Sequence, residues 1–154
     1  MFCDTHCHIL SEYYEDIESV LKEAKEAGVS RVINAGYNYE SSKEVIELVK
    51  KYPEMYGVVG LHPENISEDF DYTIFDNLDK KVVGIGEIGL DYHYTKDNKD
   101  KQIEVFERQL DIAEKLNLPV VIHSREAAGD TLEILKKHHN FGVIHSFSGS
   151  LEMA

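Results

Sequence analysis

The sequence predicts an α/β protein built on a (β/α)8 barrel, of which about six of the eight βα units can be placed. Short runs rich in β-branched residues alternate with longer segments of helical period, which is the pattern of βα units around a parallel sheet. Polar residues that could carry chemistry follow the strands, and a barrel gathers its site from the ends of several strands. An open doubly wound sheet is the alternative, but the chain contains no G-x-G-x-x-G or G-x-x-x-x-G-K-[ST] phosphate loop.

Six segments have the length and composition of buried strands. They are residues 2–8, 31–35, 56–61, 82–86, 120–123 and 142–145. The segments between them contain no repeat and no low-complexity linker. We therefore expect residues 1–154 to form a single, incomplete barrel domain.

Four helices are predicted between these strands. In the first, apolar residues recur at spacings of three and four from Ile17 to Ala27, and Gly28 closes the helix. The second ends before Pro53, and the third, residues 103–116, ends before Pro119 because proline cannot continue a helix. A fourth is predicted over residues 130–138.

Composition excludes a membrane span. Hydrophobic residues make up 42% of the 154 positions and charged residues 29%, and no apolar run approaches about 18 residues. The first residues contain neither a basic leader nor an apolar signal core, which predicts a cytoplasmic location. Cys3 and Cys7 lie about 13 Å apart on a strand, too far for a disulfide, so reduced thiols are expected.

The net charge is −13, from 16 basic and 29 acidic residues. Such a balance argues against broad electrostatic capture of a polyanion such as DNA. A local site can still bind a phosphodiester when bound cations supply the positive charge.

Two histidines open the list of candidate metal ligands. Asp4, His6 and His8 share parity on a strand, so their side chains project to one face. With 8 histidines in the chain, roughly 0.4 H-x-H pairs are expected by chance, so this pair is weak when taken alone. His138 and His139 illustrate such noise, because they fall at a helix end where a structural or solvated role suffices.

Three further strands finish in a ligand type. Glu87 follows an apolar run and shares parity with Val83 and Ile85, and a buried carboxylate is costly unless it is paired or bound to a metal. His123 and His145 each end an apolar run, and either one alone is better explained as a satisfied core histidine than as a metal ligand. Together the set provides nitrogen and oxygen ligands suited to Zn²⁺ or another first-row divalent ion, and a carboxylate can bridge two ions.

Three more polar residues lie beside these candidates. Arg125 could grip a non-bridging phosphate oxygen or form a salt bridge at the rim. His62 and Asp91, each just past a predicted strand, could orient metal ligands, contact substrate, or serve only as turn residues.

Five segments, taken in order, closely resemble the successive signatures of the TatD family. They are Phe2-Cys3-Asp4-Thr5-His6-Cys7-His8, Gly60-Leu61-His62-Pro63, Gly86-Glu87-Ile88-Gly89-Leu90-Asp91-Tyr92, Ile122-His123-Ser124-Arg125-Glu126-Ala127 and His145-Ser146-Phe147-Ser148-Gly149. The resemblance implies a barrel of the metal-dependent hydrolase type and deoxyribonuclease or exonuclease activity. By motif position, His6 and His8 would bind one metal, Glu87 would bridge, and His123 and His145 would bind the second.

Members of that family also carry a later Glu-Thr-Asp motif, whose aspartate is a metal ligand and proton acceptor. In this chain the motif would fall beyond residue 154, so we expect a chain truncated at its C-terminus that is poorly stable and catalytically feeble alone. No catalytic residue is assigned within residues 1–154.

The leading hypothesis is a hydrolase that cleaves phosphodiester bonds of DNA with a water activated by two divalent ions, Zn²⁺, Mg²⁺ or Mn²⁺. The same barrel and ligands could instead hydrolyse an ester or amide. A third possibility is an inactive fragment, or a partial subunit whose barrel another chain completes.

Overall fold

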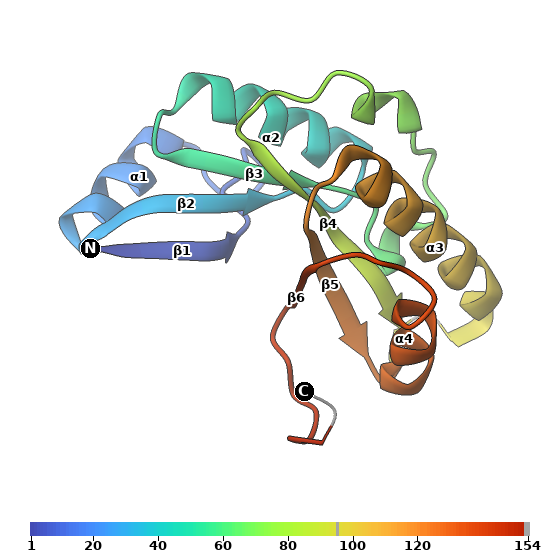
Figure 1. The fold of residues 1–154 in the computed structure, drawn as a ribbon. Coiled ribbons are helices and arrows are strands. Elements are labelled where there is room, and N and C mark those ends of the chain that lie inside the picture. Colours follow the sequence, from blue (N-terminus) through green and yellow to red (C-terminus); the bar gives the residue numbers. More distant parts are fainter. Residues whose placement is uncertain (95, 153–154) are drawn as a thin grey trace.

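The structure, a computed structural model, describes residues 1–94 and 96–152 and contains one parallel sheet of six strands in the order of the chain (Figure 1). The strands are β1 (Phe2–Cys7), β2 (Val29–Ala35), β3 (Met55–Val59), β4 (Val82–Asp91), β5 (Val120–Arg125) and β6 (Gly142–Ile144). Each strand pairs in parallel with the next. The prediction of an α/β fold with six barrel strands is confirmed.

Four α-helices connect these strands, and Figure 1 shows α1, α2 and α3 along one side of the curved sheet. They are α1 (Ile17–Glu26), α2 (Tyr39–Lys51), α3 (Lys99–Leu116) and α4 (Ala128–Leu135). Asp16 caps α1 by accepting a hydrogen bond from the Ser19 N–H. Asn38 and Ser41 form a capping box at the start of α2, which satisfies backbone N–H groups that a helix leaves free.

Short 3₁₀ turns occur in two of the connections. The chain between β3 and β4, where the sequence predicts no helix, has no α-helix in its described residues and forms two 3₁₀ turns, η1 (Pro63–Asn65) and η2 (Tyr72–Phe75). A third turn, η3 (Lys96–Asn98), leads into α3. The predicted helix over residues 130–138 begins at Ala128 and ends at Leu135, three residues early, because the last residues form turns.

The hydrophobic core lies between the sheet and its helices. Phe106 and Leu110 of α3 and Val45 and Val49 of α2 are fully buried, as is Leu90 of β4. α2 packs mainly on β3, and α3 mainly on β4. This core fixes the strands whose opposite face carries the polar site.

The lengths predicted for two strands are wrong. β4 continues from Gly86 to Asp91, and β5 continues from His123 to Arg125, because the two strands remain paired through Asp91 and Arg125. Asp91 is therefore the last residue of β4 and does not follow the strand. Polar side chains can occupy both strands because those of one strand contact those of the other, as Asp91 contacts His123.

The register between β4 and β5 is interrupted once. Ile85 pairs with Val120 and Ile88 with Ile122, so β4 places one residue more than β5 in the same interval. A bulge of this kind turns the following side chains and is common beside active sites. Ile88 and Leu90 are buried in the core, whereas Glu87, within the bulge, and Asp91, after it, lie in the polar site.

None of the helices in the described ranges combines the length and apolar character needed to cross a bilayer. Cys3 and Cys7 are free thiols, as predicted.

Candidate metal centre

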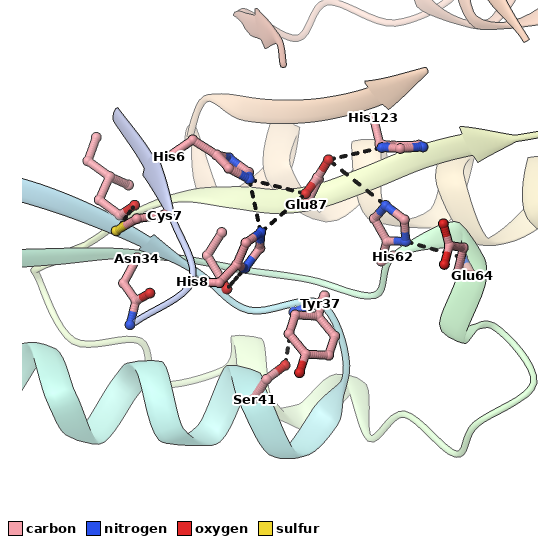
Figure 2. A network of polar contacts seen from close by, with 12 residues as sticks. His6, Cys7, His8, Asn34, Tyr37, Ser41, His62, Glu64, Glu87 and His123 are labelled. Carbon is pink, nitrogen blue, oxygen red and sulfur yellow. Dashed lines mark hydrogen bonds and ion pairs between the residues drawn. The ribbon is translucent and has the colours of Figure 1, made fainter. Parts of the chain in front are cut away.

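Histidines from β1 and β5, and from the segments that follow β1 and β3, converge on the carboxylate of Glu87 in β4, which is only 5% exposed (Figure 2). On one side His6 Nε2 lies 3.2 Å from Glu87 Oε2 and 3.2 Å from His8 Nε2. His8 Nε2 lies 4.0 Å from the same carboxylate oxygen. A tetrahedral ion with bonds of about 2.0–2.1 Å keeps its donor atoms roughly 3.3 Å apart, so this spacing suits a cation.

The other oxygen of Glu87 faces two more histidines. His123 Nδ1 lies 3.1 Å from Glu87 Oε1, and His62 Nε2 lies 3.9 Å from it. The rings of His62 and His123 meet edge to face with their centroids 4.3 Å apart. Glu87 thus has one oxygen in each of two histidine groups, which is the arrangement that a bridging carboxylate requires.

The backbone around Glu87 explains this position. The Glu87 N–H donates to Gly36 O of the loop after β2, at 3.1 Å. Gly89 has φ +140°, and a Cβ there would clash with His123 O. Glycine is therefore required two residues after Glu87, because any side chain would separate β4 from the strand that supplies His123.

The carboxyl group of Glu87 is held in its negatively charged form. Burial alone would raise the pKa of its carboxyl, but the hydrogen bonds with His123 and His6 outweigh burial and hold the pKa well below its usual range. The carboxylate is therefore ionised at neutral pH and available to a cation.

The Asp91 carboxylate lies at the ring nitrogen of His123 that faces away from Glu87. Asp91 Oδ2 lies 2.9 Å from His123 Nε2, which leaves Nδ1 directed at Glu87. Burial lowers the pKa of His123, but the two flanking carboxylates outweigh burial and raise it. A carboxylate behind a histidine is the usual way in which proteins fix the tautomer and ring orientation of a metal ligand.

Hydrogen bonds at the far ring nitrogens separate the roles of His8 and His62. His8 Nδ1 lies 2.9 Å from Ala35 O, so it carries the proton and leaves a lone pair on Nε2. His62 Nδ1 accepts from the Glu64 N–H at 3.3 Å, which puts the proton of the neutral ring on Nε2. Burial, with His123 close by, lowers the pKa of His62 to about 4, so the ring is neutral at pH 7. His8 can ligate a cation through Nε2, whereas His62 presents a donor.

His145 directly follows β6 and lies against the ring of His6. Its ring stacks on the His6 ring with centroids 3.7 Å apart and an angle of 19°. Burial, with His6 nearby, lowers the pKa of His145. Within residues 1–94 and 96–152, the two triads whose ligand atoms come together at Glu87 are His6, His8, Glu87 and His62, Glu87, His123. The structure therefore places His145 beside the first triad.

Several features fit a cation. His6 Nδ1 is buried without a hydrogen-bond partner in the described part of the chain. The Nε2 atoms of His6 and His8 both converge with a carboxylate, and protons cannot satisfy all three atoms at once.

A further triad, Asp111, Glu114 and His138, lies at the surface, where His138 Nδ1 is 3.5 Å from Asp111 Oδ1.

A pocket of about 460 Å³ opens over this centre. It is lined by His62, Glu64, Glu87, His123, Ser124, Arg125, His145, Ser146 and Ser148. In the described residues no carboxylate oxygen lies within 4.0 Å of the Arg125 guanidinium, so the rim salt bridge is not formed. Arg125 instead lies over the ring of Tyr94, 4.7 Å from its centroid.

Three buried amides that the sequence did not single out pin the backbone around the site. Asn34 binds both the N–H and the C=O of Ile9, beside His8, at 2.7 and 2.8 Å. Gln109 does the same for Leu61, beside His62, at 2.8 and 3.0 Å, and Gln102 for Asp91, at 2.7 and 2.8 Å. The available signal was the position of Gln102 and Gln109 on the apolar face of α3, in line with Phe106 and Ala113.

Comparisons with known proteins identify the family of this chain. The family model described as "TatD related DNase" matches residues 3–154. The chain is 38% identical to the uncharacterized metal-dependent hydrolase YabD of Bacillus subtilis, covering 100% of this chain and 64% of YabD. It is 34% identical to Deoxyribonuclease Tat-D of Schizosaccharomyces pombe, covering 94% of this chain and 53% of that protein.

A solved structure shows the same fold. The crystal structure of YjjV, a TatD homolog from Escherichia coli K12, superposes with a TM-score of 0.92 at 34% identity, covering 99% of this chain and 62% of YjjV. The chain thus spans 53–64% of the length of these three relatives. With a family match over nearly all its residues, the chain belongs to the TatD-related DNase family.

Proposed function

We propose that this protein hydrolyses phosphodiester bonds of DNA, using water activated by divalent cations that are held around Glu87. The observation that carries the proposal is the position of Glu87, with one carboxylate oxygen in each of two histidine triads. The names of the family and of the Schizosaccharomyces pombe relative support DNA as substrate. A cytoplasmic location remains a prediction from the first residues.

The ligand assignment follows from hydrogen bonding. His6, His8 and one oxygen of Glu87 would hold one ion, and His123 Nδ1 with the other oxygen of Glu87 would hold a second. His145 is expected to bind the second ion. It would do so from the position in which its ring stacks on the ring of His6. The donor set suits Zn²⁺ or Mn²⁺, and such ions lower the pKa of water and stabilise charge on an attacked phosphate.

The remaining polar residues would bind the substrate. His62 is a neutral ring with its proton on Nε2, so it would donate a hydrogen bond to a phosphoryl oxygen in the pocket. Arg125 lines the same pocket and has a charge that no carboxylate neutralises in the described residues. Its guanidinium would pair with a second phosphoryl oxygen.

The experiment is a nuclease assay with Mn²⁺ on linear DNA, comparing the protein with Glu87→Gln. Because the amide can no longer bridge two cations, we expect kcat/KM to fall at least about 100-fold, a typical loss on removing such electrostatic stabilisation. His139→Ala, an exposed histidine outside the site, should keep full activity. Cleavage that persists in Glu87→Gln or in EDTA would contradict the proposal.

A further inference from the structure

One aromatic side chain at the rim of the candidate centre stands largely in solvent. Tyr94, just after β4, is 62% exposed. Its ring is covered by the Arg125 guanidinium, 4.7 Å from the centroid, and is met edge-on by the His93 ring at 4.5 Å and 87°. Much of the ring therefore remains open to solvent.

Its neighbour Tyr92 shows how a structural tyrosine is held in the same segment. The Tyr92 hydroxyl donates to Asp130 at 2.8 Å, and the Lys99 ammonium lies 4.5 Å from the centre of its ring. Tyr92 thus joins the loop after β4 to α3 and α4. Tyr94 makes no such joint between helices in the described residues.

The segment that carries Tyr94 is fixed to the metal centre. Asp91 Oδ1 accepts hydrogen bonds from the His93 and Tyr94 N–H groups, both at 2.8 Å, while Asp91 Oδ2 faces His123 Nε2. One carboxylate therefore positions both a candidate metal ligand and the backbone of the exposed tyrosine. A surface fixed in advance loses little entropy when a ligand binds.

The acidic residues near Arg125 are paired with lysines, so in the described residues none of them neutralises the Arg125 guanidinium. Glu126 lies 3.6 Å from Lys96, and Asp130 lies 2.8 Å from Lys99. Arg125 has no carboxylate within 4.0 Å in the described residues, although the chain carries 29 acidic residues against 16 basic ones. The positive charge of Arg125 therefore lies over the Tyr94 ring and beside the pocket.

The distance along the sheet suits one nucleotide. His123 pairs with Gly89 and Arg125 with Asp91, so Arg125 lies two residues, or about 7 Å, beyond His123. Resting on the proposed function, we propose that Tyr94, backed by Arg125, is a stacking platform for a nucleobase adjoining the phosphate held over Glu87 and His123.

The chemistry of the platform determines its ligand. Every nucleobase has a π face that can stack on tyrosine, and a guanidinium on the same ring strengthens such contacts through cation–π attraction. The platform would hold any of the bases with little sequence preference. It would contribute nothing to a strand from which the bases have been removed.

The test is equilibrium binding, measured by fluorescence anisotropy with Ca²⁺ as the cation. Two labelled probes are compared: an oligothymidylate, and a base-free strand of equal length and charge. Tyr94→Ala should weaken binding of oligothymidylate by about 5- to 100-fold, the range seen when a stacking aromatic is removed, and leave the base-free strand unaffected. Tyr94→Phe, which keeps the ring face, should bind both probes like the unaltered protein.

A matched control is Phe141→Ala. Phe141 is 58% exposed and directly precedes β6, at the end of that strand away from His145, which lines the pocket. It should change neither affinity. Equal losses for the two probes in Tyr94→Ala, no loss for either, or no binding of oligothymidylate by the unaltered protein would overturn the platform. If the probe ratio responds to Tyr94 while hydrolysis ignores Glu87→Gln, only the proposed function fails.

Discussion

At the scale of single residues, the candidate centre depends on which ring nitrogen carries each proton. Ala35 O fixes the proton of His8 on Nδ1, and the Glu64 N–H fixes that of His62 on Nε2. Four histidines with similar positions around Glu87 thus need not share one role. The hydrogen bond on the far side of each ring decides whether the near side can bind a cation.

Asp91→Asn tests this dependence. The amide removes a negative charge behind His123, so the pKa of His123 should fall and its Nδ1 should become a weaker and less well oriented ligand. We expect divalent-ion affinity to drop about 10- to 100-fold, measured by isothermal titration with Mn²⁺. Asp130→Asn, which alters an acid bonded to Tyr92 and Lys99, should bind ions normally. Equal effects of the two variants would contradict the role of Asp91.

The two thiols should differ in reactivity. Burial, with a smaller effect of the nearby Asp4 carboxylate, raises the pKa of Cys7 to about 12, and its Sγ donates to Ile33 O. The thiolate is the reactive form, so Cys7 stays protonated and unreactive at pH 8. Mass spectrometry after brief iodoacetamide treatment should find the exposed Cys3 alkylated well before Cys7, a difference that urea removes. Equal rates in the folded protein would refute the burial of Cys7.

At the scale of elements, β4 determines the site more than any other strand. Its bulge between Ile85 and Ile88 directs Glu87 into the polar site, and Gly89 allows β5 to approach. α3 then contributes Gln102 and Gln109, whose amides bind the backbone at Asp91 and Leu61. A helix on the far side of the sheet therefore positions the loops that carry Asp91 and His62.

Gln109→Leu tests that coupling. It keeps the volume in the core but leaves the Leu61 N–H and C=O without their side-chain partner. Unsatisfied buried groups cost about 1–3 kcal/mol each, so the free energy of unfolding should fall by about 2–6 kcal/mol, measured by urea titration. Lys101→Leu, at an exposed position of the same helix, should change it by less than about 0.5 kcal/mol. Similar values for both would show that the amide is dispensable.

Sequence alone predicted the number and order of the strands, because β-branched runs and helical spacing repeat regularly along the chain. It missed the true lengths of β4 and β5, since a bulge and glycines interrupt the alternation on which strand length is judged. It also missed Asn34, Gln102 and Gln109, whose partners are backbone groups far along the chain. Sequence position placed His8 among the metal ligands and His62 outside them, but it could not reveal which ring nitrogen carries each proton, because that depends on a hydrogen bond with the backbone.

At the scale of the whole molecule, the sheet brings together residues that lie up to 117 positions apart in the chain, from His6 to His123, around one carboxylate. Net charge of −13 disfavours a long-range pull on DNA. Binding would therefore depend on the local positive charge of the cations and of Arg125. The proposed centre at Glu87 therefore depends on the binding of cations.

The most direct measurement is a crystal structure of the protein grown with Mn²⁺, with anomalous scattering recorded to locate the ions. We predict two peaks about 3.5–4 Å apart, one ligated by His6, His8 and Glu87, the other by Glu87, His123 Nδ1 and His145, with His62 Nε2 directed at neither. A map without peaks at Glu87, or with His62 Nε2 bound directly to an ion, would contradict the account.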